Sequence, residues 1–425
     1  MKQFFSLCVT ALLILGLAAC AAEEVNSDVS AVSEPTPQAT TTTESTAEAS
    51  TTTTVSRRPS TTTSTTATTS TTTPKSDYHP TPAAAQTLAN SQYLLTQKKA
   101  FNIAYYGGSI TQGTGASDEE TTSWRALTTA WLKRAYPNAV ITEIEAANGG
   151  TGTYFGKMRT DFELLNYNPD LIFIEFLVND QLERKTVEQS KENLEIIIRK
   201  CYQHNPNVDI VLVYTSTVGL PSGNPHTQAF NQIANHYGLS VIDVGAALEK
   251  ADGELTDYFT KDQVHPNDKG YQTMANEVIV QLTAMLAKAG APQKLTAHQT
   301  PQPLKEDLSL GVSAYKADEI LAQNPSLNKL APNTYCSVDS ALVTKGQAVT
   351  FNFKGTSVGV WWRCFDRSTI ISCELDGEKN VTKVLKNNTH YTYELFENLE
   401  NTDHALTITY NGDTALYLPY IFVTN

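Results

Sequence analysis

The chain has 425 residues, of which 40% are hydrophobic, and this is enough apolar material to build the cores of more than one domain. The formal net charge is −13. An acidic balance argues against nucleic acid or another polyanion as the main partner, because basic side chains are needed to neutralise phosphates.

The N-terminus predicts export. Lys2 is followed by an almost wholly apolar run over residues 7–17 and then by Leu17-Ala18-Ala19-Cys20. The run is shorter than the ~20 residues of a membrane span, so we interpret residues 1–20 as a signal segment. The small residues before Cys20 resemble a bacterial lipobox. That resemblance implies that Cys20 is lipidated, becomes the mature N-terminus and anchors the protein to the cell membrane, facing outward. The alternative is an ordinary signal peptide with a cysteine near its cleavage site.

Residues 21–85 are dominated by Thr, Ser, Ala and Pro, as in the run from Thr61 to Thr73. Such a composition buries too little apolar surface to offset the entropy of ordering the chain. We therefore predict a disordered tether that its prolines keep extended.

Residues 86–290 alternate short apolar runs with amphipathic stretches, which is typical of strands and helices in turn. Continuous apolar strands separated by helices predict a parallel sheet covered on both faces, and active sites in such folds lie beyond the carboxyl ends of the strands. The predicted strands span residues 101–106, 139–144, 171–177, 210–214 and 239–244, and the main predicted helices span residues 123–136, 186–203, 228–236 and 269–289.

The first predicted strand ends at Gly107-Gly108-Ser109-Ile110-Thr111. Two glycines allow a sharp turn and a close approach of the backbone to a ligand. Ser109 is therefore a candidate nucleophile, although Gly-Ser pairs are also common in ordinary loops. The motif is not the G-x-S-x-G elbow, because Thr111 stands where the last glycine would be.

A candidate base and its orienting carboxylate precede the last predicted helix, in Asp262-Gln263-Val264-His265-Pro266. A serine nucleophile needs a base, and the base needs a group that orients it. One turn can present both Asp262 and His265, with the second ring nitrogen facing Ser109. The alternative is a helix cap beside a surface histidine.

Candidate oxyanion donors follow the next two strands. Asn148-Gly149-Gly150-Thr151-Gly152 can expose backbone N–H groups, and Asn179-Asp180 offers a side-chain amide. The alternatives are a simple tight loop for the glycines and a helix N-cap for Asn179.

These four blocks, in this order and at these strand ends, resemble the SGNH (GDSL-like) hydrolase superfamily over roughly residues 95–290. Ser109 matches the first block in its G-G-S-I-T form. The family's glycine falls on Gly150, with Gly149 and Gly152 close by, and its asparagine falls on Asn179. Two positions depart from the usual pattern: Gly108 stands in place of the Asp of G-D-S, and Val178 stands where Gly is usual.

The resemblance implies a three-layer α/β/α, flavodoxin-like fold and a catalytic triad of Ser109, Asp262 and His265. It implies an oxyanion hole made by the Ser109 N–H, the Gly150 N–H and the Asn179 side chain. The expected chemistry is ester hydrolysis through an acyl-enzyme, without a metal or an organic cofactor.

The C-terminal part of the chain has a different sequence pattern, a polar segment followed by short strand-like runs. Residues 291–320 form a polar linker containing Pro292, Pro301 and Pro303. Residues 321–425 predict short strands with hairpin turns at Asp376-Gly377 and Asn411-Gly412, which indicates an all-β sandwich of jelly-roll kind. This domain loosely resembles accessory domains of glycan-acting enzymes.

Two features of the β domain remain open from sequence. Trp361-Trp362 could stack on a sugar, or at least one of the rings could belong to the core, because neighbouring strand residues point to opposite faces. Cys364 and Cys373 are close enough for one disulfide in an exported chain, or they are buried thiols, as Cys201 and Cys336 could also be.

The leading functional hypothesis is a cell-surface esterase that removes acetyl or other short acyl groups from polysaccharide. A lipase or a sugar O-acyltransferase would use the same triad. A non-catalytic glycan-binding protein on a decayed hydrolase scaffold is the rival from another class. The oligomeric state is not predicted.

Overall fold

The computed structural model describes residues 87–333, 336, 338–365, 368–386 and 389–425. The signal segment 1–20 with its Cys20, and the tether 21–85, lie outside the described residues. Over the part that is described, no helix has the length and apolar character needed to cross a membrane.

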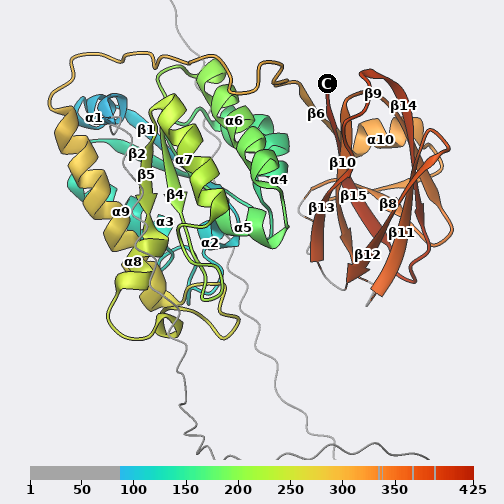
Figure 1. Cartoon of the computed structure of the whole chain (residues 1–425), viewed down its shortest axis with the longest axis horizontal. Coiled ribbons are helices and arrows are strands. Elements are labelled where there is room, and N and C mark those ends of the chain that lie inside the picture. Colours follow the sequence, from blue (N-terminus) through green and yellow to red (C-terminus); the bar gives the residue numbers. More distant parts are fainter. Residues whose placement is uncertain (1–86, 334–335, 337, 366–367, 387–388) are drawn as a thin grey trace, which may run out of the picture. The chain divides into compact units, whose positions relative to one another are not determined.

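The first folded domain is built on a five-stranded parallel sheet in the order β2-β1-β3-β4-β5 (Figure 1). This is the strand order of flavodoxin-like, doubly wound folds and confirms the predicted architecture. Its strands are β1 (Ala100–Gly107), β2 (Val140–Ala147), β3 (Leu171–Glu175), β4 (Asp209–Tyr214) and β5 (Ser240–Asp243). The third strand ends at Glu175 and not at the predicted Leu177, because Leu177 already begins a helix.

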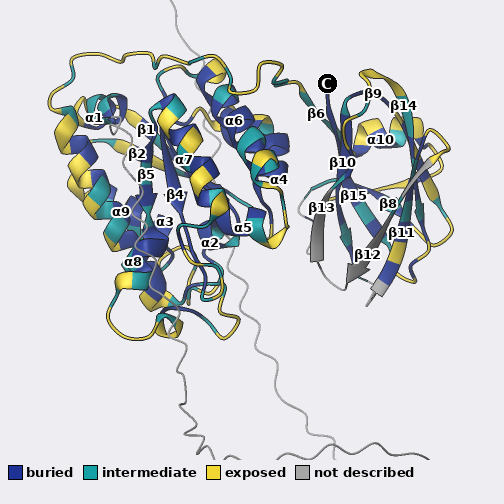
Figure 2. Ribbon diagram, in the orientation of Figure 1, coloured by how far each residue is buried: buried dark blue, intermediate teal, exposed yellow. Residues whose placement is uncertain are grey.

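Helices cover both faces of this sheet. Along β1, Ile103 and Tyr105 join one buried cluster while Ala104 and Tyr106 join the other. The first cluster includes residues of α1 (Ala89–Thr96), α3 (Trp124–Ala135), α8 (Val244–Lys250) and α9 (Asp268–Ala289). The second includes residues of α6 (Val187–His204) and α7 (Pro225–Tyr237). Figure 2 shows these helices buried toward the sheet and exposed on their outer sides.

Side-chain caps set the starts of the long helices, as their sequences suggest. The Ser123 hydroxyl accepts from the Ala126 N–H at the start of α3. Thr186 and Gln189 form a capping box at the start of α6. Shorter elements were not predicted: α2 (Ser109–Gln112), α4 (Thr153–Arg159), the π-helical turn η1 (Thr160–Leu164), the 3₁₀ turns η2 (Leu165–Tyr167) and η3 (Leu255–Tyr258), and α5 (Leu177–Leu182).

The C-terminal domain consists of antiparallel sheets that share one apolar core, as the sandwich prediction requires. One sheet has the order β13-β10-β15-β8-β7 with β6 paired to β15, and the other has the order β12-β11-β14-β9. The elements are β6 (Val312–Lys316), α10 (Ala317–Gln323), β7 (Asn328–Leu330), β8 (Ser340–Val343), β9 (Ala348–Gly355), β10 (Ser357–Cys364), β11 (Ser368–Leu375), β12 (Lys379–Lys386), β13 (Thr389–Phe396), β14 (Thr402–Tyr410) and β15 (Leu416–Thr424).

Strand pairing begins at Val312, inside the segment 291–320 that the sequence assigns to the linker. Asp376-Gly377, with φ of 55° and 73°, joins the paired strands β11 and β12, so this predicted hairpin is confirmed. The hairpin predicted at Asn411-Gly412 is wrong. That turn joins β14 to β15, and these two strands lie in different sheets.

The tryptophan pair of the β domain is buried. Trp362 lies in the core of the sandwich, and Trp361 is 4% exposed and packs on Tyr420 and on Phe155 of α4. Of the two interpretations left open by the sequence, the one that places at least one ring in the core is confirmed, and the buried rings do not form a sugar-stacking platform. Cys364 and Cys373 are buried thiols.

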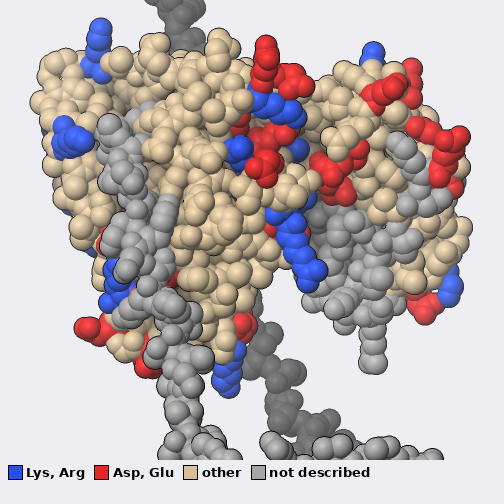
Figure 3. Space-filling model, viewed as in Figure 1, with Lys and Arg blue, Asp and Glu red and all other residues tan. Residues whose placement is uncertain are grey.

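The linker lies along the α/β domain before the β domain begins. The Arg199 guanidinium donates to the Pro301 carbonyl at 2.7 Å, and the Leu304 N–H donates to Glu195 at 2.7 Å. On the face shown in Figure 3, both basic and acidic side chains are present.

Candidate active site

The candidate nucleophile stands where β1 ends. Ser109 is the first residue of α2, and Gly108 precedes it in an extended conformation. After one turn, Gly113 adopts a φ of 110° and ends the helix. The short helix holds Ser109 at the carboxyl edge of the parallel sheet, where the fold places its active sites.

The structure brings the three predicted triad residues together. His265 Nε2 lies 2.8 Å from Ser109 Oγ, and His265 Nδ1 lies 2.7 Å from Asp262 Oδ2. The assignment of hydrogens that fits both contacts puts the proton on Nδ1, where it bonds the carboxylate, so that Nε2 can accept from the serine. This chain of hydrogen bonds can take a proton from Ser109.

The second carboxylate oxygen of Asp262 fixes the turn itself. Asp262 Oδ1 accepts from the Thr260 hydroxyl and from the backbone N–H groups of Val264 and His265. Partial burial alone would raise the pKa of Asp262, but the bonds from the His265 ring, these N–H groups and Thr260 outweigh it and hold the pKa well below its usual range. Asp262 is therefore an ionised partner for the imidazole.

The two departures from the family pattern have structural consequences. A Cβ atom at position 108 would lie 2.6 Å from Asn179 Oδ1, so glycine at this position makes room for the Asn179 side chain. Val178 is 1% exposed and packs in the core on one face of the sheet. Neither departure disturbs the contact between Ser109 and His265.

Asn179, in α5, is 6% exposed and lies beside the nucleophile loop. Within the part of the chain that the structure describes, no hydrogen bond engages its side-chain amide. The amide is available to an oxygen that develops negative charge next to Ser109.

The glycine loop after β2 also lies against the nucleophile. A Cβ atom at Gly149 would be 3.6 Å from Ser109 Cβ. Gly150 has a φ of 73°, a conformation that favours glycine. The Gly152 N–H donates to Glu183 at 2.7 Å, so Gly152 is the least suited of the three glycines to serve as an oxyanion donor.

Asp180 binds Thr153, the residue that follows Gly152. Its buried carboxylate accepts from the Thr153 N–H at 2.7 Å and from the Thr153 hydroxyl at 2.8 Å. Burial raises the pKa of Asp180, and the bonds from Thr153 oppose that shift. Asp180 and Glu183 therefore bind the loop from its downstream end.

A buried cation holds the strand ends. Arg159, at the end of α4, has no solvent exposure and donates to the carbonyls of Ala146 at 2.6 Å and of Gly107 at 2.9 Å. Its charge is paired with Glu163 at 2.8 Å. Both acceptors lie in the last residues of β1 and β2, directly before the two loops of the candidate site.

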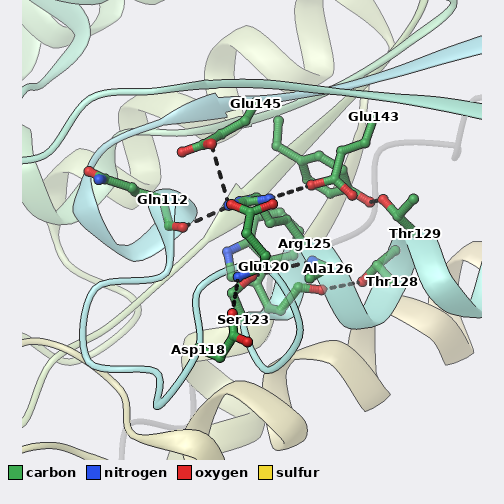
Figure 4. A network of polar contacts seen from close by, with 12 residues as sticks. Gln112, Asp118, Glu120, Ser123, Arg125, Ala126, Thr128, Thr129, Glu143 and Glu145 are labelled. Atoms are coloured by element: carbon green, nitrogen blue, oxygen red, sulfur yellow. Dashed lines mark hydrogen bonds and ion pairs between the residues drawn. The ribbon is translucent and has the colours of Figure 1, made fainter. Parts of the chain in front are cut away.

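A second buried arginine ties down the segment between α2 and α3. Figure 4 shows Arg125 reaching Glu143 at 2.5 Å, Glu120 at 2.6 Å, Glu145 at 3.4 Å and the Gln112 carbonyl at 3.3 Å. Gly115 of the same segment packs on His265, since a Cβ atom at Gly115 would lie 3.1 Å from His265 Cβ. The Arg125 contacts thus support the end of α2 and the segment that packs against His265.

Sequence reasoning missed Arg159, Arg125, Glu175 and Glu183. Asp180 was visible only as the neighbour of Asn179. The sequence signal available for such residues was a single charged side chain next to an apolar run, as at Glu175 after Leu171–Ile174. Among the described residues, no cluster of three or more His, Cys, Asp or Glu side chains could hold a metal ion.

Comparisons with known proteins concern the family and the fold of the chain. Residues 105–273 match the model of the GDSL-like Lipase/Acylhydrolase family. A crystal structure of a two-domain esterase (CEX) active on acetylated mannans, co-crystallised with mannopentaose, is similar with a TM-score of 0.65 and 23% identity, over 77% of this chain and 92% of that one. A second structure of a two-domain esterase (CEX) active on acetylated mannans gives a TM-score of 0.63 and 24% identity, over 79% and 96%. No curated protein matches the chain. At these identities the two structures establish the shared two-domain fold.

Gly108→Ala tests the packing of the nucleophile loop on Asn179. The added methyl must displace the Asn179 amide, and we expect kcat for p-nitrophenyl acetate to fall about 100-fold, as for other displacements of about 1 Å. Gly219→Ala is the matched control, because a Cβ there meets nothing within 4 Å. Equal activity of the two variants would contradict this account of Gly108.

Asp262→Asn tests the orienting carboxylate. The amide cannot hold the Nδ1 proton as the carboxylate does, and we expect kcat to fall about 1,000-fold or more while the fold is retained. The exposed Asp252→Asn serves as a control for the loss of one acidic charge and should keep full activity. A loss of less than tenfold in Asp262→Asn would show that Asp262 does not orient the base.

Proposed function

We propose that the protein is a serine esterase that removes acetyl or other short acyl groups from polysaccharide outside the cell, because residues 105–273 match the model of the GDSL-like Lipase/Acylhydrolase family. The observation that carries the proposal is the continuous hydrogen-bonded series of Ser109, His265 and Asp262 at the carboxyl edge of the sheet.

The reaction uses groups that are in place. His265 Nε2 takes the proton as Ser109 Oγ attacks the ester carbonyl, and Asp262 stabilises the imidazolium. The oxyanion accepts from the N–H groups of Ser109 and Gly150 and from the Asn179 amide. His265 then protonates the leaving alcohol, and water deprotonated by His265 hydrolyses the acyl-enzyme.

The choice of substrate draws support from the two-domain structures. The structural neighbours that share both domains are described as active on acetylated mannans. Fold alone does not give function, so acylated polysaccharide is proposed as the substrate class and not as a particular glycan. The rival hypothesis of a non-catalytic glycan-binding protein leaves the assembled triad without a purpose.

The purified protein should hydrolyse p-nitrophenyl acetate faster than esters of longer acids, and it should release acetate from acetylated mannan. Ser109→Ala removes the nucleophile and should lower kcat at least about 1,000-fold. Rates that rise with acyl length would favour a lipase, and acyl transfer to an added sugar at the expense of hydrolysis would favour a transferase. No turnover above Ser109→Ala on any ester would overturn the proposal.

Lipid anchoring through Cys20 is proposed from the lipobox-like sequence before it and the Thr/Ser-rich tether that follows. In a bacterial host, labelled palmitate should enter the wild-type protein and be absent from Cys20→Ser, which should leave the membrane fraction. Cys8→Ser lies in the same signal segment and is the matched control that should keep the label. Label retained by Cys20→Ser would exclude this anchor.

A further inference from the structure

A fully buried carboxylate lies under the nucleophile loop. Glu175 is the last residue of β3 and has no solvent exposure. Its Oε2 accepts from the Thr111 hydroxyl at 2.8 Å and its Oε1 from the Thr215 hydroxyl at 2.8 Å. An ionisable group is expensive to bury unless it is fully hydrogen-bonded, so its presence at this strand end calls for a role beyond filling space.

The same carboxylate anchors the turn that carries the nucleophile. Thr111, whose hydroxyl it binds, lies two residues after Ser109 in α2, and Gly107, two residues before Ser109, pairs with Glu175 between β1 and β3. Within the described residues, no protein acceptor takes the N–H of Ser109 itself. Glu175 therefore holds the turn through a side chain and leaves the Ser109 N–H for a ligand.

The peptide group between Gly107 and Gly108 is held by a buried cation. Its carbonyl, on Gly107, accepts from Arg159 at 2.9 Å. Arg159 thus fixes the backbone directly before Ser109, while Glu175 fixes the turn after it through the Thr111 hydroxyl.

The surroundings leave this peptide little room to move. A Cβ atom at Gly107 would lie 2.6 Å from the Glu175 carbonyl and would overlap the Thr111 hydroxyl. Burial raises the pKa of Glu175, and the bonds from the Thr215 and Thr111 hydroxyls oppose that shift.

We propose that Glu175 is a positioning residue for the esterase reaction: by binding the Thr111 hydroxyl, it holds the turn of α2 that directs the Ser109 N–H toward the oxyanion and the Ser109 hydroxyl toward His265. The inference rests on the proposed function, because it requires Ser109 to be the nucleophile. It assigns to a residue outside the triad the task of setting the geometry of the attacking group.

Glu175→Gln is the test, since it keeps the shape of the side chain, removes its charge and forces one of the two threonine hydroxyl bonds to reverse or break. We expect kcat for p-nitrophenyl acetate to fall about 10- to 100-fold while KM changes less than about threefold, because the geometry of attack is altered and ground-state binding is not. Circular dichroism and the thermal midpoint report whether the variant is folded.

Asp209→Asn is the matched control for the loss of a buried carboxylate. Asp209 is also fully buried and hydrogen-bonded, to Ser91 and His298, but it begins β4 at the opposite edge of the sheet. The Asp209→Asn variant should have a lower thermal midpoint and a kcat within about twofold of the wild-type value, as expected when a purely structural carboxylate is lost.

Glu175→Asp covers the case in which Glu175→Gln does not fold. It keeps the charge but withdraws it from the loop by one methylene, and we expect an intermediate loss in kcat of about tenfold. A folded Glu175 variant with wild-type kcat would overturn the inference while leaving the proposed function intact. A wild-type protein that turns over no ester would overturn the proposed function and the inference with it.

Discussion

The site depends on how the polar backbone groups at the ends of β1 and β2 are satisfied where no water reaches them. Buried carbonyls need donors, and the Arg159 guanidinium supplies them to both Gly107 and Ala146. The cation is tolerated in this position because Glu163 pairs with it and because its planar face stacks on Tyr106, 4.4 Å from the ring centre. One side chain thereby fixes the starting points of both the nucleophile loop and the glycine loop.

Carboxylates complement this cation by taking up hydrogen-bond donors next to the site. Glu175 binds the Thr111 hydroxyl, Asp180 binds the N–H of Thr153 and Glu183 binds the N–H of Gly152. Each of these bonds also removes a donor that could otherwise compete for an incoming oxygen. The Ser109 N–H is left without a protein acceptor among the described residues, so it stays available to the proposed oxyanion.

Much of this architecture follows from short-range features of the sequence. Apolar runs alternating with amphipathic stretches predicted the parallel sheet, and Asp262 and His265 were recognisable because three residues of one turn separate them. Glu175 and Arg159 were not predicted, because their partners come from elements that meet only in the folded domain. The hairpin predicted at Asn411-Gly412 was wrong for a related reason: a turn signal does not show which sheet the next strand joins. The place of Trp361 stayed open, because strand alternation does not reveal what packs on the outer face of a sheet.

The presence of Gly108 in place of the usual Asp agrees with the packing around this position. A side chain at position 108 would collide with Asn179. A glycine avoids this collision and leaves room for the Asn179 amide beside the nucleophile loop. The orientation of Ser109 can then be set by the buried side chains of Arg159 and Glu175, and not by a side chain of the nucleophile loop itself. That arrangement confines the tight constraints to the interior of the domain and leaves the outer surface of the loop open to the substrate.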